Sequence, residues 1–422
     1  MRGPFKATNV VLALLCVMYF ITYVDRVNVN SAAGAFQDEL GLNNTRLGLI
    51  FSAFAYPYLV FQVIGGWVGD KFGARRVLFV CGLIWAGATI LTGLSWSFYS
   101  LFFMRLLLGF GEGATFPTAT RAMRSWVEPK KYGFAQGITH SFARLGNTIT
   151  PPLVAALVVA TSWRWSFAII GVISLIWVAV WYWYFRDEPS EHPAITQAEL
   201  AVLPPSRAGK QAPQVPWGPL IRRMWPVTLT YFCYGWCLWL YLNWIPLFFQ
   251  RNHDMDIKDS ALFASGVFLA GFVGDTVGGV MSDKILHATG NLRLARLSVT
   301  VLGFVGALLS LVPLLYFHDV TIVALSLSAG FFFAELVIGP MWAIPMDIAP
   351  KYSGTASGLM NSGSAFAAIA SPLVAGYIID VTGNWELPFF VLMGLLTVGA
   401  LSAFLMHPEK PFEDAPTEPR TA

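Results

Sequence analysis

The chain has 422 residues, of which 56% are hydrophobic and 12% are charged. Ordinary globular proteins contain about 25% charged residues, so a soluble fold of this size could not cover its surface with so few. The net charge of +3 and the scattered basic residues also argue against nucleic acid as a partner. We therefore expect an all-α integral membrane protein that is surrounded by lipid.

Apolar segments recur along the whole chain, and a helix needs about 20 such residues to cross a bilayer. In chain order we predict twelve spans, over residues 9–30, 46–68, 76–95, 101–122, 134–160, 163–185, 225–249, 260–282, 296–316, 320–344, 355–378 and 386–406. The first segment contains Asp25 and Arg26, and no small-residue cleavage site follows it. We therefore expect a retained helix there and not a signal peptide.

The basic residues predict the orientation of the chain, because cytoplasmic loops of membrane proteins carry an excess of Lys and Arg. If both termini are cytoplasmic, 20 of the 27 Lys and Arg residues lie on that side. The opposite side then holds four of them, which are Arg46, Arg164, Arg251 and Lys258. We therefore expect both termini in the cytoplasm.

The two halves of the chain resemble each other on either side of a polar, proline-containing stretch. Gly65–Lys71 recurs as Gly278–Lys284, and Pro151 recurs as Pro372. Such a parallel repeat predicts two pseudo-symmetric six-helix bundles, as in transporters whose substrate site lies between the halves. We assign the chain to an N-terminal bundle, a cytoplasmic linker, a C-terminal bundle and a cytoplasmic tail, over residues 1–185, 186–224, 225–408 and 409–422.

The loop between spans two and three combines glycines with charged residues. It reads Gly66-x-x-x-Asp70-Lys71-x-Gly73-x-Arg75-Arg76, which resembles the signature loop of the major facilitator superfamily. Glycines let helices approach closely, and an acid flanked by bases can cap helix ends. The resemblance implies the major facilitator fold and a cytoplasmic gate formed by Gly66, Asp70, Lys71, Gly73, Arg75 and Arg76, with Asp283 in the second half.

Further motifs resemble the anion:cation symporter family within that superfamily, a group that includes bacterial sugar-acid transporters. They are Tyr23-Val24-Asp25-Arg26 in span one, Tyr56-Pro57-Tyr58 in span two, and Arg105-x-x-x-Gly109-x-x-Glu112-Gly113 in span four. Trp342 and Asn361 in spans ten and eleven add to this match. Span five departs from the pattern, because Ala143-Arg144-Leu145-Gly146 stands where some sugar-acid members have Gln.

Seven charged side chains lie inside the predicted spans, where each costs about 2.5–3.5 kcal/mol at a helix centre. They are Asp25, Arg26, Arg105, Glu112, Arg144, Asp275 and Glu335. A carboxyl in an apolar cavity has its charged form disfavoured, and a nearby arginine favours that form again. A conformational change between these environments can therefore load and unload a proton. Arginine stays charged and offers a planar fork that suits a carboxylate.

These properties and the resemblance predict the role of each residue. We expect Asp25 and Glu112 to couple protons, and Arg26 and Arg105 to bind an anionic substrate. The positions that match the family's motifs imply further substrate contacts from Tyr23, Tyr58, Trp342 and Asn361. Arg144, Glu335 and Asp275 are candidates for additional charges of the cavity.

The sequence thus predicts a secondary active transporter that carries a small organic anion together with protons by alternating access. A sugar acid such as an aldonate, an aldarate or a hexuronate is the favoured substrate. Motifs of hydrolases, metalloproteases and nucleotide-binding loops do not occur, so we expect no enzymatic activity and no cofactor. The four cysteines lie in apolar stretches and offer no metal site. We expect a functional monomer in the inner (plasma) membrane.

Several alternatives stay open at this point. The substrate could be an aromatic or dicarboxylic acid, because an arginine fork suits these anions equally. A neutral-sugar facilitator would not need two arginines in its cavity, and the span-five signature of drug antiporters is poorly matched. A membrane-embedded enzyme would require Glu112 and His140 to be catalytic.

Overall fold

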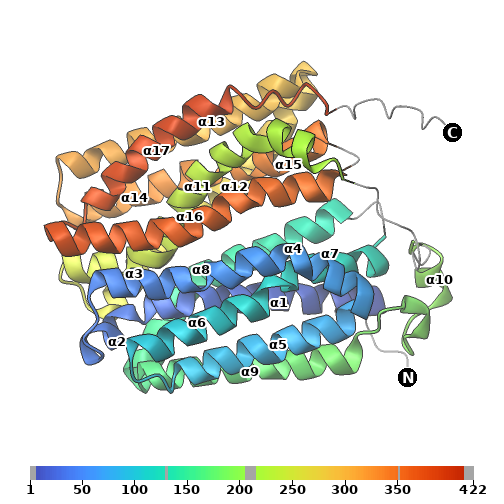
Figure 1. Cartoon of the computed structure of the whole chain (residues 1–422), viewed down its shortest axis with the longest axis horizontal. Helices are drawn as coiled ribbons and strands as arrows, with labels where there is room; N and C mark the ends of the chain where they lie inside the picture. Colours follow the sequence, from blue (N-terminus) through green and yellow to red (C-terminus); the bar gives the residue numbers. More distant parts are fainter. Residues whose placement is uncertain (1–5, 129–131, 205–214, 350–351, 413–422) are drawn as a thin grey trace. The chain divides into compact units, whose positions relative to one another are not determined.

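The computed structural model describes residues 6–128, 132–204, 215–349 and 352–412 (Figure 1). Across these residues the regular secondary structure is helical and no strand occurs, which confirms the predicted all-α fold. The contacts divide the chain into two compact units. The first comprises Met1–Gly209, Trp239–Phe272 and Ala368–Pro388, and the second comprises Lys210–Leu238, Val273–Ala367 and Phe389–Ala422.

The first unit holds the helices that precede the middle of the chain. They are α1 (Ala7–Ser31), α2 (Ala33–Glu39), α3 (Asn44–Ala53), α4 (Ala55–Phe72), α5 (Ala74–Thr92), α6 (Phe98–Gly113), α7 (Thr115–Trp126), α8 (Tyr132–Ala160), α9 (Trp163–Tyr184) and α10 (Gln197–Leu200). Within this unit α1 packs against α8, and α5 packs against both α6 and α9 (Figure 1). Helices that are far apart in the sequence therefore lie side by side.

The later helices are α11 (Trp217–Asn252), α12 (Ile257–Thr289), α13 (Leu292–Leu311), α14 (Val320–Glu335), α15 (Ile338–Ile348), α16 (Ser353–Thr382) and α17 (Leu387–Ala403). In the second unit α13 packs against α14 and α15. The long helices α11, α12 and α16 contribute residues to both units. Helix α11 begins within the stretch that the sequence assigned to the linker.

Most of the predicted spans are single long helices. Within the described residues, nine helical segments are long and apolar enough to cross a membrane, and they coincide with predicted spans one, three and five to eleven. Span two is divided into α3 and α4 at Phe54, span four into α6 and α7 at Ala114, and span ten into α14 and α15 at residues 336–337. Span twelve is the shorter apolar helix α17. Every predicted span therefore corresponds to helix.

Glycines bring the divided spans two and four together. A Cβ atom at Gly109 of α6 would overlap the carbonyl oxygen of Phe54, and one at Gly65 of α4 would overlap the backbone of Ala114. The breaks in spans two and four are therefore held in close contact where only a glycine fits. Close approach through small residues is the usual means of helix association in membranes.

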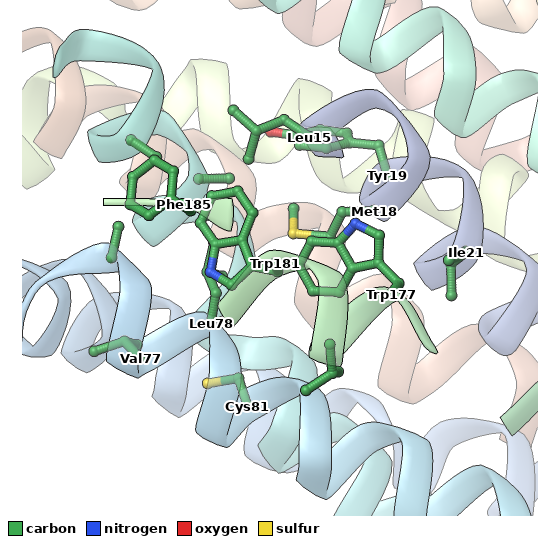
Figure 2. Close-up of a cluster of buried hydrophobic side chains, with 14 of the residues drawn as sticks. Leu15, Met18, Tyr19, Ile21, Val77, Leu78, Cys81, Trp177, Trp181 and Phe185 are labelled. Carbon is green, nitrogen blue, oxygen red and sulfur yellow. The ribbon is translucent and has the colours of Figure 1, made fainter. Parts of the chain in front are cut away.

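Aromatic side chains form the core of the first unit between α1, α5 and α9. The rings of Trp177, Trp181 and Phe185 follow one another along α9, with centroids 5.5 Å and 4.1 Å apart. Figure 2 shows them beside Leu78 and Cys81 of α5. The spacing of four residues places all three rings on one face of the helix. Because this core packs against α1, it holds the side of α1 that carries Asp25 toward α5 and α9.

Residues 186–204 of the predicted linker belong to the first unit and pack within it. The ring of His192 is buried against the rings of Trp126 and Tyr184, with centroids 5.2 Å and 4.6 Å away. The Glu199 carboxylate accepts hydrogen bonds from the backbone N–H and hydroxyl of Thr8, at 3.2 Å and 3.1 Å. Linker residues 205–214, together with tail residues 413–422, lie outside the described residues.

Glu199 also caps its own helix α10, because it forms a capping box with Thr196. Burial disfavours its charge, but the hydrogen bonds from Thr8 and Thr196 outweigh this and hold the pKa of the Glu199 carboxyl below its usual value. A group with a lowered pKa contributes stability above its unfolded pKa, and that contribution is lost as the pH falls toward the folded pKa. The attachment of α10 to α1 is therefore expected to weaken in acid.

We predict that Glu199→Gln lowers the stability of the purified protein by about 1 kcal/mol at pH 7.5, because hydrogen bonds to a charged acceptor are lost. The difference between the variant and the wild type should shrink at an acidic pH near the lowered pKa of Glu199, where the wild-type carboxylate itself becomes protonated. Melting midpoints in detergent at both pH values measure this. The exposed Glu191→Gln serves as the control, and a difference that is independent of pH would contradict the assignment.

Candidate substrate and proton site

Four charged side chains from α1 and α6 lie inside the first unit. Asp25, Arg26, Arg105 and Glu112 are each at most 4% exposed. Charges at this depth are costly unless they pair with one another or bind a ligand. Their environments differ, and the differences indicate what each group can do.

Arg26 and Glu112 form a buried ion pair. The Nε atom of Arg26 lies 2.6 Å from Oε2 of Glu112, and the two side chains are 5% and 0% exposed. Glu112 is in the last turn of α6, directly before the break at Ala114. The pair thus joins span one to the point where span four is interrupted.

Four aromatic rings surround the Arg26 guanidinium. Its Cζ atom lies 4.8 Å from the ring centroids of Tyr23, Tyr58 and Phe116, and 5.1 Å from that of Phe54. Such cation–π contacts stabilise a cation in an apolar environment. The sequence predicted Tyr23 and Tyr58 as site residues, whereas Phe54 and Phe116 were not among the predicted site residues.

The guanidinium of Arg105 has hydrogen-bonding capacity that the described residues leave unused. Its Nε and Nη1 atoms are buried and have no hydrogen-bond partner among these residues. The Cζ atom lies 5.3 Å from the ring centroid of Phe54, and Glu112, Arg26 and Asp25 are all within electrostatic reach. Buried donors without acceptors are costly, so these N–H groups are suited to an anionic ligand.

Asp25 faces a different set of groups from Arg26, although the two residues are adjacent. Its carboxylate accepts a hydrogen bond from the hydroxyl of Thr89 on α5 and another from Ser174 on α9, each at 3.1 Å. Adjacent residues on a helix point about 100° apart, which accounts for the separation. Thr89 and Ser174 did not appear among the residues predicted from the sequence.

The remaining five predicted site residues lie on helices α8, α12, α14, α15 and α16. Trp342 and Asn361 belong to the second unit, where the indole N–H of Trp342 donates to the hydroxyl of Tyr231 at 2.9 Å. Arg144 on α8 and Asp275 on α12 are half-buried. Glu335, at the end of α14, is fully buried and accepts a hydrogen bond from Tyr234 at 3.0 Å. Among the described residues, no three His, Cys, Asp or Glu side chains are grouped to hold a metal ion.

The signature loop after α4 is attached to the end of α9. Gly73 has a φ of +83°, a conformation that favours glycine. The Arg75 guanidinium donates to the carbonyl oxygen of Tyr182 at 2.7 Å and 3.0 Å, and the Arg75 backbone N–H donates to Asp187 at 3.1 Å. Lys71 and Arg76 are exposed.

Other parts of the predicted gate are described less fully. Gly66 and Asp70 lie in α4, but their surroundings fall outside the described part of the structure. In the second unit, Arg296 bridges Asp283 and Asp347 at 3.3 Å and 3.0 Å. The gating role of these residues stays a prediction.

The sequence of the chain matches the family described as Major Facilitator Superfamily over residues 15–372 and 293–422. The chain belongs to the major facilitator superfamily. This confirms the predicted fold class, with twelve spans in two related halves, and the prediction of a transporter instead of an enzyme. The chain is therefore a multi-pass membrane protein.

Several superfamily members of known or assigned role resemble the whole chain. A "probable sulfoacetate transporter SauU" of Cupriavidus necator is 47% identical over 413 residues, which cover 97% of this chain and 96% of that protein. A "probable galactarate/D-glucarate transporter GarP" of Escherichia coli is 30% identical, over 94% of this chain and 93% of that protein. A "hexuronate transporter" of Bacillus subtilis is 29% identical, with 93% of each chain covered. The relatives are thus named for sugar acids and other organic anions.

Solved structures of superfamily members share the fold. A bacterial homolog of the human lysosomal transporter Spinster, in an inward-facing and occupied conformation, has a TM-score of 0.78 at 16% identity, with 98% of this chain and 100% of that chain covered. A point mutant of the nucleoside transporter NupG has a TM-score of 0.71 at 14% identity, with 94% of this chain and 100% of that chain covered. At these identities the likeness concerns the fold alone.

We predict that Arg105→Lys weakens binding of the transported anion by at least about tenfold, because lysine keeps the charge but loses the planar fork. The protein should still insert and elute as a single species in detergent. Binding isotherms on purified protein measure the loss. Arg164→Lys, in a surface pair with Glu39, is the matched control and should bind normally. Loss of expression instead of affinity would indicate that Arg105 mainly balances Glu112.

Proposed function

We propose that this superfamily member carries a small organic anion across the membrane together with protons, by alternating access. The observation that carries the proposal is the buried guanidinium of Arg105, whose Nε and Nη1 donors find no acceptor among the described residues. An anionic group of the substrate would accept these hydrogen bonds and offset the buried positive charge. The organic-anion names of the relatives support this assignment.

We favour a short dianion as substrate, with sulfoacetate first. The relative at 47% identity bears that name, and its similarity covers almost the whole of both chains. Sulfoacetate carries a sulfonate and a carboxylate, and both groups accept hydrogen bonds from guanidinium. Arg26 and Arg105 could therefore each bind one end of sulfoacetate, or both could bind the same end.

Sugar acids are the second candidate, because more distant relatives are named for galactarate, D-glucarate and hexuronate. The hydroxyls of Tyr23 and Tyr58 beside Arg26 could bind a polyol chain, with Asn361 and Trp342 as further proposed contacts. The stretch Ala143-Arg144-Leu145-Gly146 stands where some sugar-acid members of the family have Gln, and this difference separates the chain from those members.

The arrangement of Arg26 and Glu112 suggests how protons and anion are coupled. When Glu112 binds a proton, its ion pair with Arg26 is neutralised and the guanidinium becomes available to the substrate anion. This proton offsets one of the two negative charges of a dianion. Asp25, held by two hydroxyls and not by an arginine, is proposed as the other proton carrier. Neutral hydroxyl partners allow it to change protonation without separating from a cation.

We further propose the inner membrane as the location, both termini in the cytoplasm and a functional monomer. The excess of Lys and Arg in alternate loops supports the orientation. The proposed division into bundles over residues 1–185 and 225–408, with the signature loops as cytoplasmic gates, rests on the repeat in the sequence.

The substrate is tested by thermal shift of the purified protein against a panel of acids. A ligand that binds only the native state stabilises it by RT ln(1 + [L]/Kd), so the tightest ligand at equal concentration gives the largest shift. We expect sulfoacetate to exceed galactarate, glucuronate and a neutral hexose. A larger shift with galactarate would favour the sugar-acid alternative, and a shift with the neutral hexose alone would contradict anion transport.

The coupling role of Glu112 is tested with Glu112→Gln, which keeps the shape of the side chain but cannot carry a proton. In proteoliposomes we expect this variant to bind and exchange substrate in counterflow, yet to fail in pH-driven accumulation. Asp25→Asn should behave in the same way. The surface residue Glu39 supplies the control Glu39→Gln.

Wild-type accumulation in Glu112→Gln would refute its coupling role. A parallel loss of binding, exchange and thermal stability would instead indicate that the acid only balances Arg26, since removing one partner leaves the other charge unpaired at membrane depth.

A further inference from the structure

The second unit contains a buried carboxyl at the place that corresponds to Glu112. Glu335 is the last residue of α14 and precedes the break to α15, just as Glu112 precedes the break between α6 and α7. A proline follows five residues after each acid, at Pro117 and Pro340. Both acids are 0% exposed.

The packing of these two breaks is also equivalent. In the first unit a Cβ atom at Gly65 would overlap the backbone of Ala114, at the break after Glu112. In the second unit a Cβ atom at Gly278, which matches Gly65 in the repeat, would overlap the carbonyl group of Leu336, next to Glu335. Each acid thus lies within two residues of a close glycine contact at the interruption of its span.

The partner of the acid differs between the halves. Glu112 is bound by Arg26 of α1, whereas Glu335 accepts a hydrogen bond from the hydroxyl of Tyr234 on α11 at 3.0 Å. Span one reads Tyr23-x-x-Arg26, and span seven reads Tyr234-x-x-Cys237 at the corresponding spacing. Cys237 is buried and within electrostatic reach of Glu335. At the spacing that Arg26 has from Tyr23, span seven therefore carries the uncharged thiol of Cys237.

Tyr234 is itself part of a small polar cluster. Its ring centroid lies 5.1 Å from that of Tyr231, whose hydroxyl accepts the indole N–H of Trp342 at 2.9 Å. These side chains come from α11 and α15. A buried carboxyl beside tyrosine hydroxyls has hydrogen-bonding groups that can support either its protonated or its ionised form.

We propose that Glu335 is a further proton-binding site of the transport cycle, additional to Asp25 and Glu112. Its carboxylate takes up one proton from the side of higher proton concentration and releases it on the other side in each cycle. No bond other than the carboxyl O–H forms or breaks. This inference rests on the proposed function, because it assumes proton-coupled uptake of an anion.

A third proton changes the electrical character of transport. A dianion accompanied by two protons moves no net charge, so the membrane potential would not drive its uptake. A dianion accompanied by three protons moves one positive charge per cycle, so an inside-negative membrane potential then drives its uptake. Glu335 would thereby connect the uptake of anions to the membrane potential.

Other titratable groups on the neighbouring elements must be kept constant in a test. They are Tyr231, Tyr234 and Cys237 on α11, Asp275 on α12, Arg293 and Arg296 on α13 and Asp347 on α15. Arg293 is paired with Glu409, and Arg296 is paired with Asp283 and Asp347. Substitution of Glu335 alone leaves all of these in place.

The experiment uses the full chain in proteoliposomes with labelled sulfoacetate, and galactarate as a second dianion. The number of protons per substrate is obtained from the pH gradient at which net flux reverses. A potassium diffusion potential with valinomycin reports the charge that is moved. We expect the wild type to respond to the potential, and Glu335→Gln to move one proton fewer per substrate and to lose the response. Glu335→Asp keeps a titratable carboxyl and should retain both.

The same proton-to-substrate ratio in Glu335→Gln and the wild type would overturn the proposal. The proposal would also be overturned if uptake by the wild type did not respond to the membrane potential. This measurement uses the wild type alone and does not depend on the folding of any variant. Failure of the proposed function has a different result. If proton-coupled uptake is wrong, pH-driven accumulation is absent in the wild type or persists in Glu112→Gln, whatever the result at Glu335.

Discussion

The buried ion pair of Arg26 and Glu112 is the interaction on which the rest of the proposed site depends. A charge in the middle of a membrane span is tolerated only if another group balances it. Glu112 balances Arg26 at 2.6 Å, and four aromatic rings enclose the same guanidinium. Arg105 is left with donors that no described residue accepts. Of these two buried arginines, Arg26 is thus paired, and Arg105 is the one that we propose to bind the anion.

The helix breaks and glycines explain how this pair is held in position. Span four is interrupted directly after Glu112, and Gly65 and Gly109 allow α4 and α6 to meet at that level without an intervening side chain. The aromatic core of α9 supports another side of α1, about 100° from Arg26, where Thr89 and Ser174 bind Asp25. Two carboxyls from adjacent spans therefore have different partners, one a cation and the other a pair of hydroxyls.

Much of this could be predicted from the sequence, because the signals are local. Apolar runs predicted the twelve spans, and the charges at Asp25, Arg26, Arg105 and Glu112 stand out in those runs. The breaks at Phe54 and Ala114 were not predicted, since hydropathy does not change there. Phe54, Phe116, Thr89 and Ser174 are common residues in apolar helices, and only tertiary packing brings them to the charged groups. The attachment of Glu199 to Thr8 joins residues 191 positions apart and has no local signal.

The most direct test of the central claim is the position of the substrate's anionic group in crystals grown with sulfoacetate. Sulfoacetate contains one sulfur atom, so an anomalous difference map locates its sulfonate, with the sulfurs of the 12 methionines and four cysteines as internal references. We predict an additional peak beside the Nε and Nη1 atoms of Arg105, near the aromatic rings that surround Arg26. A bound sulfonate at another place, with those two atoms still without an acceptor, would contradict the account.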